Sequence, residues 1–135
     1  MKKLIVGLLA LFILSACTGG TSASITGQWE LVSHGSVSSQ TPAAPGVDTS
    51  IEFGSDGALS GNVGCNGFGG DFKVEGDTIA FGSVMSTMMF CEGPVGEQEQ
   101  ATLAVFQGSA TFVLDGNTLT ITSSDGNFVI VLARK

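Results

Sequence analysis

Apolar and polar residues alternate with a period of two along most of the chain from Gly27 onward. In segment 118–122, Leu119 and Ile121 fall on one face of an extended strand and three threonines fall on the other. The last apolar run, 128–132, is apolar on both faces, which is typical of a strand covered on both sides. Six further segments show the alternation, with inward pairs Trp29 and Leu31, Ile51 and Phe53, Leu59 and Val63, Phe72 and Val74, Ile79 and Phe81, and Phe112 and Leu114. The pattern predicts eight short strands.

Turn signals separate these segments. Asp-Gly pairs occur at 56–57, 115–116 and 125–126, and Glu-Gly-Asp occurs at 75–77. These positions suit hairpin turns, because glycine adopts the positive φ that such turns require. The stretch 35–47 is rich in Ser, Pro and Gly and is predicted to be a surface loop within one domain.

One stretch departs from the period of two and predicts a helix at about 96–107. Glu97 and Glu99 are expected in its first turn, where the helix dipole favours anions. Thr102, Leu103 and Phe106 form its apolar stripe, and Gly108 is placed to end it.

The elements together predict a mainly β domain over residues 26–135. Eight antiparallel strands with one helix inserted before the sixth suit a small barrel or a strongly curled meander. Closure would remove the free strand edges that invite pairing with other chains. At 135 residues, the chain fits one domain with a sizeable core.

The first 16 residues are predicted to be a signal peptide. Lys2 and Lys3 precede an apolar run over 4–14, which is too short as a helix to cross the ~30 Å bilayer core. Leu14-Ser-Ala-Cys17 resembles a bacterial lipobox, which implies that Cys17 becomes the new N-terminus and carries a diacylglycerol thioether. The alternative is an ordinary secretory signal in which Cys17 is incidental.

The segment 17–25 would then be a flexible tether that holds the domain near a membrane. Thr18 follows the lipobox where Asp would resemble an inner-membrane retention signal, so the outer membrane, facing the periplasm, is expected if the organism has one. Without residues 1–16 the chain has three basic and twelve acidic residues, a net charge of −9. This charge argues against a nucleic-acid partner held by phosphate contacts.

Two cysteines remain after Cys17, and an even count in an exported protein favours a Cys65–Cys91 disulfide. Two reduced thiols or a metal pair are the alternatives. Met85, Met88, Met89 and Cys91 form a soft-ligand cluster of the kind that suits Cu(I), although ordinary packing explains the methionines as well. We therefore expect neither a metal nor a cofactor.

The remaining candidates have simple structural explanations. His34 is the only histidine and is interpreted as a solvated loop residue without catalytic partners. An acid–base pair could be drawn from Glu92, Glu97, Glu99, Asp71 and Glu75, but a solvated acidic face and a helix N-terminus explain them better. The glycine-dense segment 61–70 lacks a phosphate-loop lysine, so its glycines are predicted to allow bends, with Asn62 and Asn66 bonding backbone groups there.

Three motifs in order resemble the META domain family of HslJ-like heat-shock lipoproteins. They are Gly64-Cys65-Asn66 followed by Gly69 and Gly70, then Ser86-Thr87-Met88-Met89-Phe90-Cys91, then the Glu-rich stretch from Glu97 to Leu103. The segments 27–31 and 51–57 also look like the first two strands of that family. Phe90 is a departure, because the family often has Ala there. The resemblance implies a lipocalin-like antiparallel barrel with one helix, an envelope role linked to heat or envelope stress, and no assigned catalytic residue.

Three functions follow as hypotheses. The first is a lipid-anchored, non-enzymatic envelope protein that acts through contacts with another envelope protein. The second is a carrier of a small apolar ligand or lipid inside the barrel, since most of the nine Phe lie on the inward set. An enzyme, such as a hydrolase, is the third and least supported.

Overall fold

The structure is a computed structural model that describes residues 24–135. The predicted signal peptide, Cys17 and nearly all of the predicted tether lie outside the described residues. Within the described range no helix combines the length and apolar character needed to cross a bilayer. The elements are β1 (Gly27–Gly35), β2 (Gln40–Pro42), β3 (Ser50–Phe53), β4 (Ala58–Asn62), β5 (Gly67–Glu75), β6 (Thr78–Ser86), α1 (Gly93–Val105), β7 (Ser109–Asp115), β8 (Thr118–Thr122) and β9 (Val129–Arg134).

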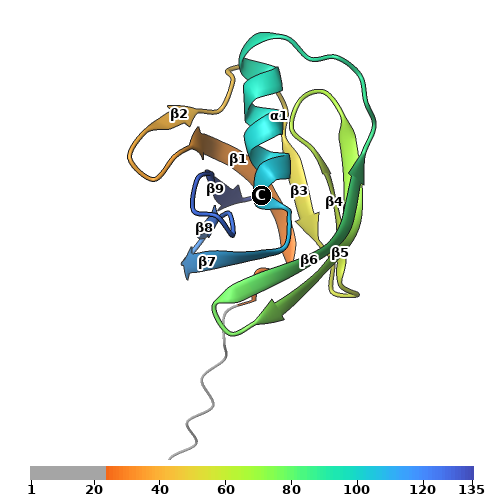
Figure 1. Ribbon diagram of the computed structural model, residues 1–135, viewed down its shortest axis with the longest axis vertical. Coiled ribbons are helices and arrows are strands. Elements are labelled where there is room, and N and C mark those ends of the chain that lie inside the picture. The colour runs from red at the N-terminus through yellow and green to blue at the C-terminus, as the bar shows by residue number, and fades with distance from the viewer. Residues whose placement is uncertain (1–23) are drawn as a thin grey trace, which may run out of the picture.

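Eight of the strands form a closed antiparallel barrel (Figure 1). Each strand from β3 to β9 pairs with the next, and β1 closes the ring by pairing with both β3 and β9. Leu31 lies opposite Leu132 in the closing pair, and the register shifts between Leu31 and Ser33. The predicted eight-stranded barrel is confirmed.

The strand β2 is an addition outside the ring. It pairs only with the end of β1, where His34 lies opposite Thr41. The prediction that 35–47 is loop throughout is therefore wrong for Gln40–Pro42. All three β2 residues are exposed, so the segment shows no alternation of apolar and polar residues from which a strand could be predicted.

The inward positions of the strands are mostly those that the alternation predicts, but the prediction is wrong for Val74, which is 42% exposed near the end of β5. Trp29, Ile51, Phe53, Ile79, Leu119 and Ile121 are fully buried. Glycines at the predicted turns have positive φ, for example +84° at Gly57 and +57° at Gly116. Local sequence therefore specifies both the faces of the strands and the sites where they reverse.

The helix α1 covers one side of the barrel and lies nearest to β1 and β9. Strands β6 and β7 pair over only three residues each, from Thr78 to Ala80 on β6, and the rest of β6 diverges from β7. In Figure 1 the helix lies between β1 and β9 on one side and β3 to β6 on the other. It begins at Gly93 with Pro94 in its first turn, three residues earlier than predicted, and ends at Val105. Glu97 and Glu99 are consequently not in the first turn, which contains no acidic residue.

Phe106, immediately after α1, occupies the middle of the core. Its ring centroid lies 5.0 Å from that of Phe81, 5.4 Å from Phe68 and 6.4 Å from Phe53. The surrounding strand residues form one continuous cluster of buried side chains. Aromatic rings thus fill the interior between the strands, as an eight-stranded barrel allows.

The two ends of the barrel differ. The described chain starts at Ser24, at the same end as the turns 54–57, 76–77 and 116–117; we call this the N-terminal end (Figure 1). There the Arg134 guanidinium stacks 4.2 Å from the centre of the Trp29 ring and donates to Ser24 O and Thr26 O. Because the strands alternate in direction, the segments 63–66, 87–92 and 123–128 lie at the opposite end, which we call the loop end.

Candidate functional site

Most of the motif residues meet at the loop end, around the side chain of Asn66. Asn66 is 3% exposed and lies between β4 and β5. Its amide nitrogen donates to Met89 O at 3.0 Å, and its amide oxygen accepts from Met89 N at 2.8 Å and from Thr87 Oγ1 at 2.9 Å. Asn66 therefore bonds a segment 23 residues away rather than its own turn.

Glu99 supports Asn66 from the helix. One carboxylate oxygen accepts from Asn66 N at 2.7 Å, and the other accepts from Asn66 Nδ2 at 2.6 Å. Glu99 is buried, so its interpretation as part of a solvated acidic face is wrong. The physical reason is that two N–H donors from a distant turn replace water around the carboxylate.

A disulfide closes the same cluster. Cys65 is bonded to Cys91, with Cα atoms 6.2 Å apart, as the cysteine count predicts. The Glu99 carboxylate lies within 4.8 Å of both sulfurs, but bonded sulfurs are not thiolate ligands. Cys91 is thus committed to Cys65 and does not join the methionines in the Cu(I) cluster considered above.

Two glycines let the helix approach this cluster. A Cβ on Gly64, which has φ of +119°, would lie 2.6 Å from Val47 Cγ1 and 2.9 Å from Val95 Cγ1. A Cβ on Gly96 would collide with the carbonyl oxygen of Cys91. Gly64 in the first motif is therefore required by close packing against the start of α1.

Gln98 is a structural residue that the sequence reasoning missed. Its side chain is fully buried, accepts from Ala44 N at 2.9 Å and donates to Val63 O. It links α1 to the segment before β3 and to the end of β4. A glutamine in a Glu- and Gln-rich helix carries no local sign of burial, because its partners lie 35 and 54 residues away.

The cluster presents a set of large apolar side chains to solvent. Met88 is 95% exposed and Phe90 is 86% exposed, and Met85 and Met89 are also exposed. We call Met85, Met88, Met89 and Phe90 the apolar loop. Thr87, Met89 and Cys91 are all bonded to the turn 65–67, through hydrogen bonds or the disulfide. The backbone that displays these side chains is therefore held at every second residue.

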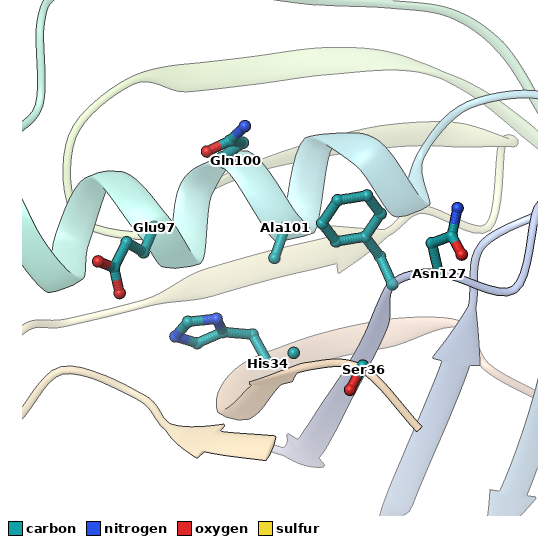
Figure 2. Close-up of a pocket in the computed structure, with 8 residues that line it drawn as sticks. His34, Ser36, Glu97, Gln100, Ala101 and Asn127 are labelled. Atoms are coloured by element: carbon teal, nitrogen blue, oxygen red, sulfur yellow. The ribbon is translucent and has the colours of Figure 1, made fainter. Parts of the chain in front are cut away.

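A cleft of about 350 Å³ lies beside α1 at the loop end (Figure 2). Its walls come from the end of β1, from α1 and from the connection between β8 and β9. The residues that line it are His34, Gly35, Ser36, Glu97, Gln100, Ala101, Asn127 and Phe128. In Figure 2 the Glu97 carboxylate and the His34 imidazole point toward one another across the opening.

His34 is not the solvated loop residue that was predicted. It belongs to β1, pairs with Thr41 on one side and Ile130 on the other, and is only 5% exposed. Burial lowers the pKa of its imidazole below the usual 6.5, and the Glu97 carboxylate partly opposes that effect. The imidazole is therefore neutral at pH 7.

The other candidate acids do not gather into a pair. Asp71 and Glu75 are exposed on β5, and Glu92 is exposed before α1. Glu97 is exposed at the rim of the cleft. Ser86 is the last residue of β6, lies opposite Phe68 and follows Met85, the one apolar-loop residue that belongs to the strand.

The molecule is thus a small closed β-barrel with a filled interior, one covering helix and a disulfide-bonded cluster at one end. The META domain family matches residues 23–135, and the chain belongs to that family. The family assignment agrees with the positions of the three motifs, which meet in one place.

Solved structures show the same fold in other proteins. An NMR structure of a protein from Burkholderia xenovorans is 19% identical and covers 81% of each chain, with a TM-score of 0.64. A second NMR structure is 21% identical over 78% of this chain and 86% of the other, with a TM-score of 0.61. A DUF4847 family protein from Bacteroides vulgatus is 16% identical over 82% and 93%, with a TM-score of 0.55. No curated protein matches the sequence significantly.

Proposed function

We propose that this protein is a lipid-anchored, non-enzymatic component of the bacterial cell envelope that binds another protein through the apolar loop. The observation that carries the proposal is the rigid exposure of Met85, Met88, Met89 and Phe90. Exposed apolar groups that are not randomly scattered mark interaction sites, and a backbone held in place reduces the entropy lost on binding. Methionine side chains also adapt to an apolar partner surface.

The charges around the loop indicate the chemistry of the partner. Glu92 follows the apolar loop directly, and Glu97 and Asp125 also lie at the loop end. The three basic residues of the described chain are engaged elsewhere: Lys73 with Glu75, Lys135 with Asp48, and Arg134 with Trp29. The occupant is therefore a protein with an apolar patch bordered by Lys or Arg. A second copy would bring acidic residues together, and an anionic bilayer would repel them.

The position of the loop supports a protein partner over the anchoring membrane. The described chain starts at the N-terminal end of the barrel, while the apolar loop lies at the loop end (Figure 1). An anchor at Cys17 would hold the N-terminal end toward the bilayer and leave the apolar loop facing away from it. In an organism with two membranes, the proposed location is the outer membrane, facing the periplasm. A role in heat or envelope stress is proposed from the family resemblance.

Site-specific photo-crosslinking in the native host tests the loop. A photoreactive phenylalanine analogue at Met88 is expected to yield a discrete adduct whose crosslinked peptide is apolar and flanked by Lys or Arg. Val113, which is 66% exposed on β7, is the control position. The adduct should be lost when Phe90→Ser is added. Self-adducts, lipid adducts, or the same pattern at Val113 would each overturn the proposed partner.

A separate experiment tests the anchor. Cys17→Ser is expected to release the protein from the membrane fraction and to abolish the mass of the acyl chains on the N-terminal peptide. Membrane association equal to that of wild type would contradict lipid anchoring, whatever the result at Met88.

The barrel interior does not support the carrier hypothesis. Phe53, Phe68, Phe81 and Phe106 occupy the space that a ligand would need. We therefore do not propose an internal carrier as a second function.

A further inference from the structure

The cleft beside α1 contains an imidazole whose ring makes no hydrogen bond to the described part of the chain. His34 is 5% exposed, yet no hydrogen bond reaches its ring nitrogens from any residue in the range 24–135. Among the described residues no fully buried side-chain nitrogen or oxygen lacks a partner, so the ring nitrogens of His34 are not enclosed by protein and open onto the cleft. The ring faces the cleft in Figure 2, so its nitrogens are available to a bound molecule.

The groups around the opening favour a donor over an acceptor. The Glu97 carboxylate offers acceptors only, whereas the neutral imidazole has one lone pair and one N–H. The amides of Gln100, on α1, and Asn127, in the β8–β9 connection, can each accept or donate, so the carboxylate decides the preference. No Lys or Arg is among the lining residues, and the described chain has a net charge of −9. The field of the protein therefore attracts cations and opposes anions.

The floor of the cleft provides apolar contact. Ala101 is buried and Phe128 is half-buried, and both line the cleft. An aromatic ring attracts a nearby cation and packs against an apolar group. A volume of about 350 Å³ is at the small end of the range for ligand sites, which limits the occupant to a small molecule.

We infer that this cleft binds a small organic cation, a primary ammonium on a compact apolar body. The ammonium donates to the Glu97 carboxylate and to His34, and the body packs on Phe128 and Ala101. This site is separate from the apolar loop, so it does not depend on the proposed protein partner.

The single histidine makes the inference testable by NMR. The untagged, mature lipidated protein in detergent micelles has one imidazole, so the ring C–H signals belong to His34. Benzylammonium is the probe, with benzyl alcohol and benzoate as neutral and anionic analogues of the same shape. We expect benzylammonium to shift the His34 signals saturably, benzyl alcohol to bind several-fold more weakly, and benzoate to leave them unchanged.

The benzylammonium affinities of two glutamate variants test whether the Glu97 carboxylate selects the cation. Glu97→Gln is expected to weaken benzylammonium binding about fivefold, the effect of one exposed ion pair. Glu92→Gln removes the same charge outside the cleft lining and should change the affinity less than twofold. Both glutamates are exposed, so neither change should alter the fold. Equal effects of the two variants, equal binding of benzyl alcohol, or unchanged His34 signals would overturn the inference.

Affinity should also fall at acid pH. Protonated His34 repels an ammonium and no longer offers a lone pair, and its pKa lies below 6.5. Glu97 on α1 is the charged group that faces the ring, whereas Thr41 on β2 and Ile130 on β9 are uncharged. Benzylammonium binding should therefore be constant above pH 6.5 and weaken as the pH falls through the pKa of His34. His34→Gln should remove this dependence; a retained dependence would contradict the role of His34.

Discussion

Asn66 uses its side chain in the way that a strand uses a peptide group. It accepts from Met89 N and donates to Met89 O, as one residue of an antiparallel pair would. The same amide also bonds Thr87 and Glu99, so one side chain connects the turn after β4, the loop after β6 and the helix. This explains why Asn, and not merely a small polar residue, stands in the first motif.

At the residue scale, Asn66→Ala is expected to lower the free energy of unfolding by about 2–4 kcal/mol. The change removes five side-chain hydrogen bonds and leaves the buried Glu99 carboxylate with only the backbone N–H of residue 66. Urea unfolding measures the loss, and amide exchange at Met89 should become faster. Asn117→Ala, in the exposed β7–β8 turn, is the control and should change stability by about 0.5 kcal/mol or less. A loss at Asn66 no larger than this would contradict the network.

At the scale of elements, the segment 87–92 is irregular in secondary structure but firmly held. Hydrogen bonds at Thr87 and Met89 and the disulfide at Cys91 fasten it to the 65–67 turn. Ordinary loops expose polar side chains, whereas this one exposes Met88 and Phe90. Its rigidity thus comes from long-range bonds rather than from local turn chemistry.

Replacing both Cys65 and Cys91 by Ala is expected to lower the free energy of unfolding by about 3–4 kcal/mol. The bond closes a loop of about 27 residues, and its loss restores the entropy of that loop to the unfolded chain. Urea unfolding of the double variant tests the value, and wild type in reductant should unfold at the same urea concentration as the variant. A variant within about 1 kcal/mol of oxidised wild type would show that the bond contributes little.

At the scale of the whole molecule, the barrel has a filled interior and two different ends. Phe106 enters the core from the end of α1 and contacts rings from β3, β5 and β6. The N-terminal end is covered by Trp29 and Arg134, while the apolar loop and the cleft both lie at the loop end. Binding is therefore expected at one end of the molecule rather than inside it.

Phe106→Ala is expected to lower the free energy of unfolding by about 3–5 kcal/mol, because it leaves a cavity among apolar side chains. A dry apolar cavity of this kind binds benzene. The variant should therefore gain stability in the presence of benzene, measured as a rise in melting temperature, whereas wild type should not. The control, Val113→Ala on the exposed face of β7, should behave as wild type. Equal stabilisation of wild type by benzene would show that the interior is already open.

The strands and turns were predictable because their determinants are local. Side chains in a strand alternate between core and solvent, and tight turns need glycine at positive φ, so both leave a short-range pattern. The helix was predicted, but its start was placed three residues late. The prediction followed the run of helix-forming residues, whereas the helix begins earlier, with Pro94 in its first turn. Strand β2 was missed because it is exposed on every residue.

The candidate site was only partly predictable. The motif residues and the cysteine pair were identified, but the roles of Glu99, Gln98 and His34 were wrong or missed. Glu99 and Gln98 are buried with hydrogen-bond partners far away in the chain, and His34 is buried on β1 beside Ile130 of β9. Glu99 meets Asn66 from 33 residues away, and Gln98 meets Ala44 from 54 residues away.

The sequence by itself determined the class of this protein: an antiparallel barrel or curled meander with one helix and a pair of cysteines able to join. Hydrophobic periodicity, turn glycines and cysteine count are properties of neighbouring residues or of composition. Only the tertiary structure decided which polar residues are buried and which apolar residues are left exposed. That choice depends on chain segments that are distant in sequence and become neighbours only when the barrel closes, and it is what placed the apolar loop and the His34 cleft together at one end.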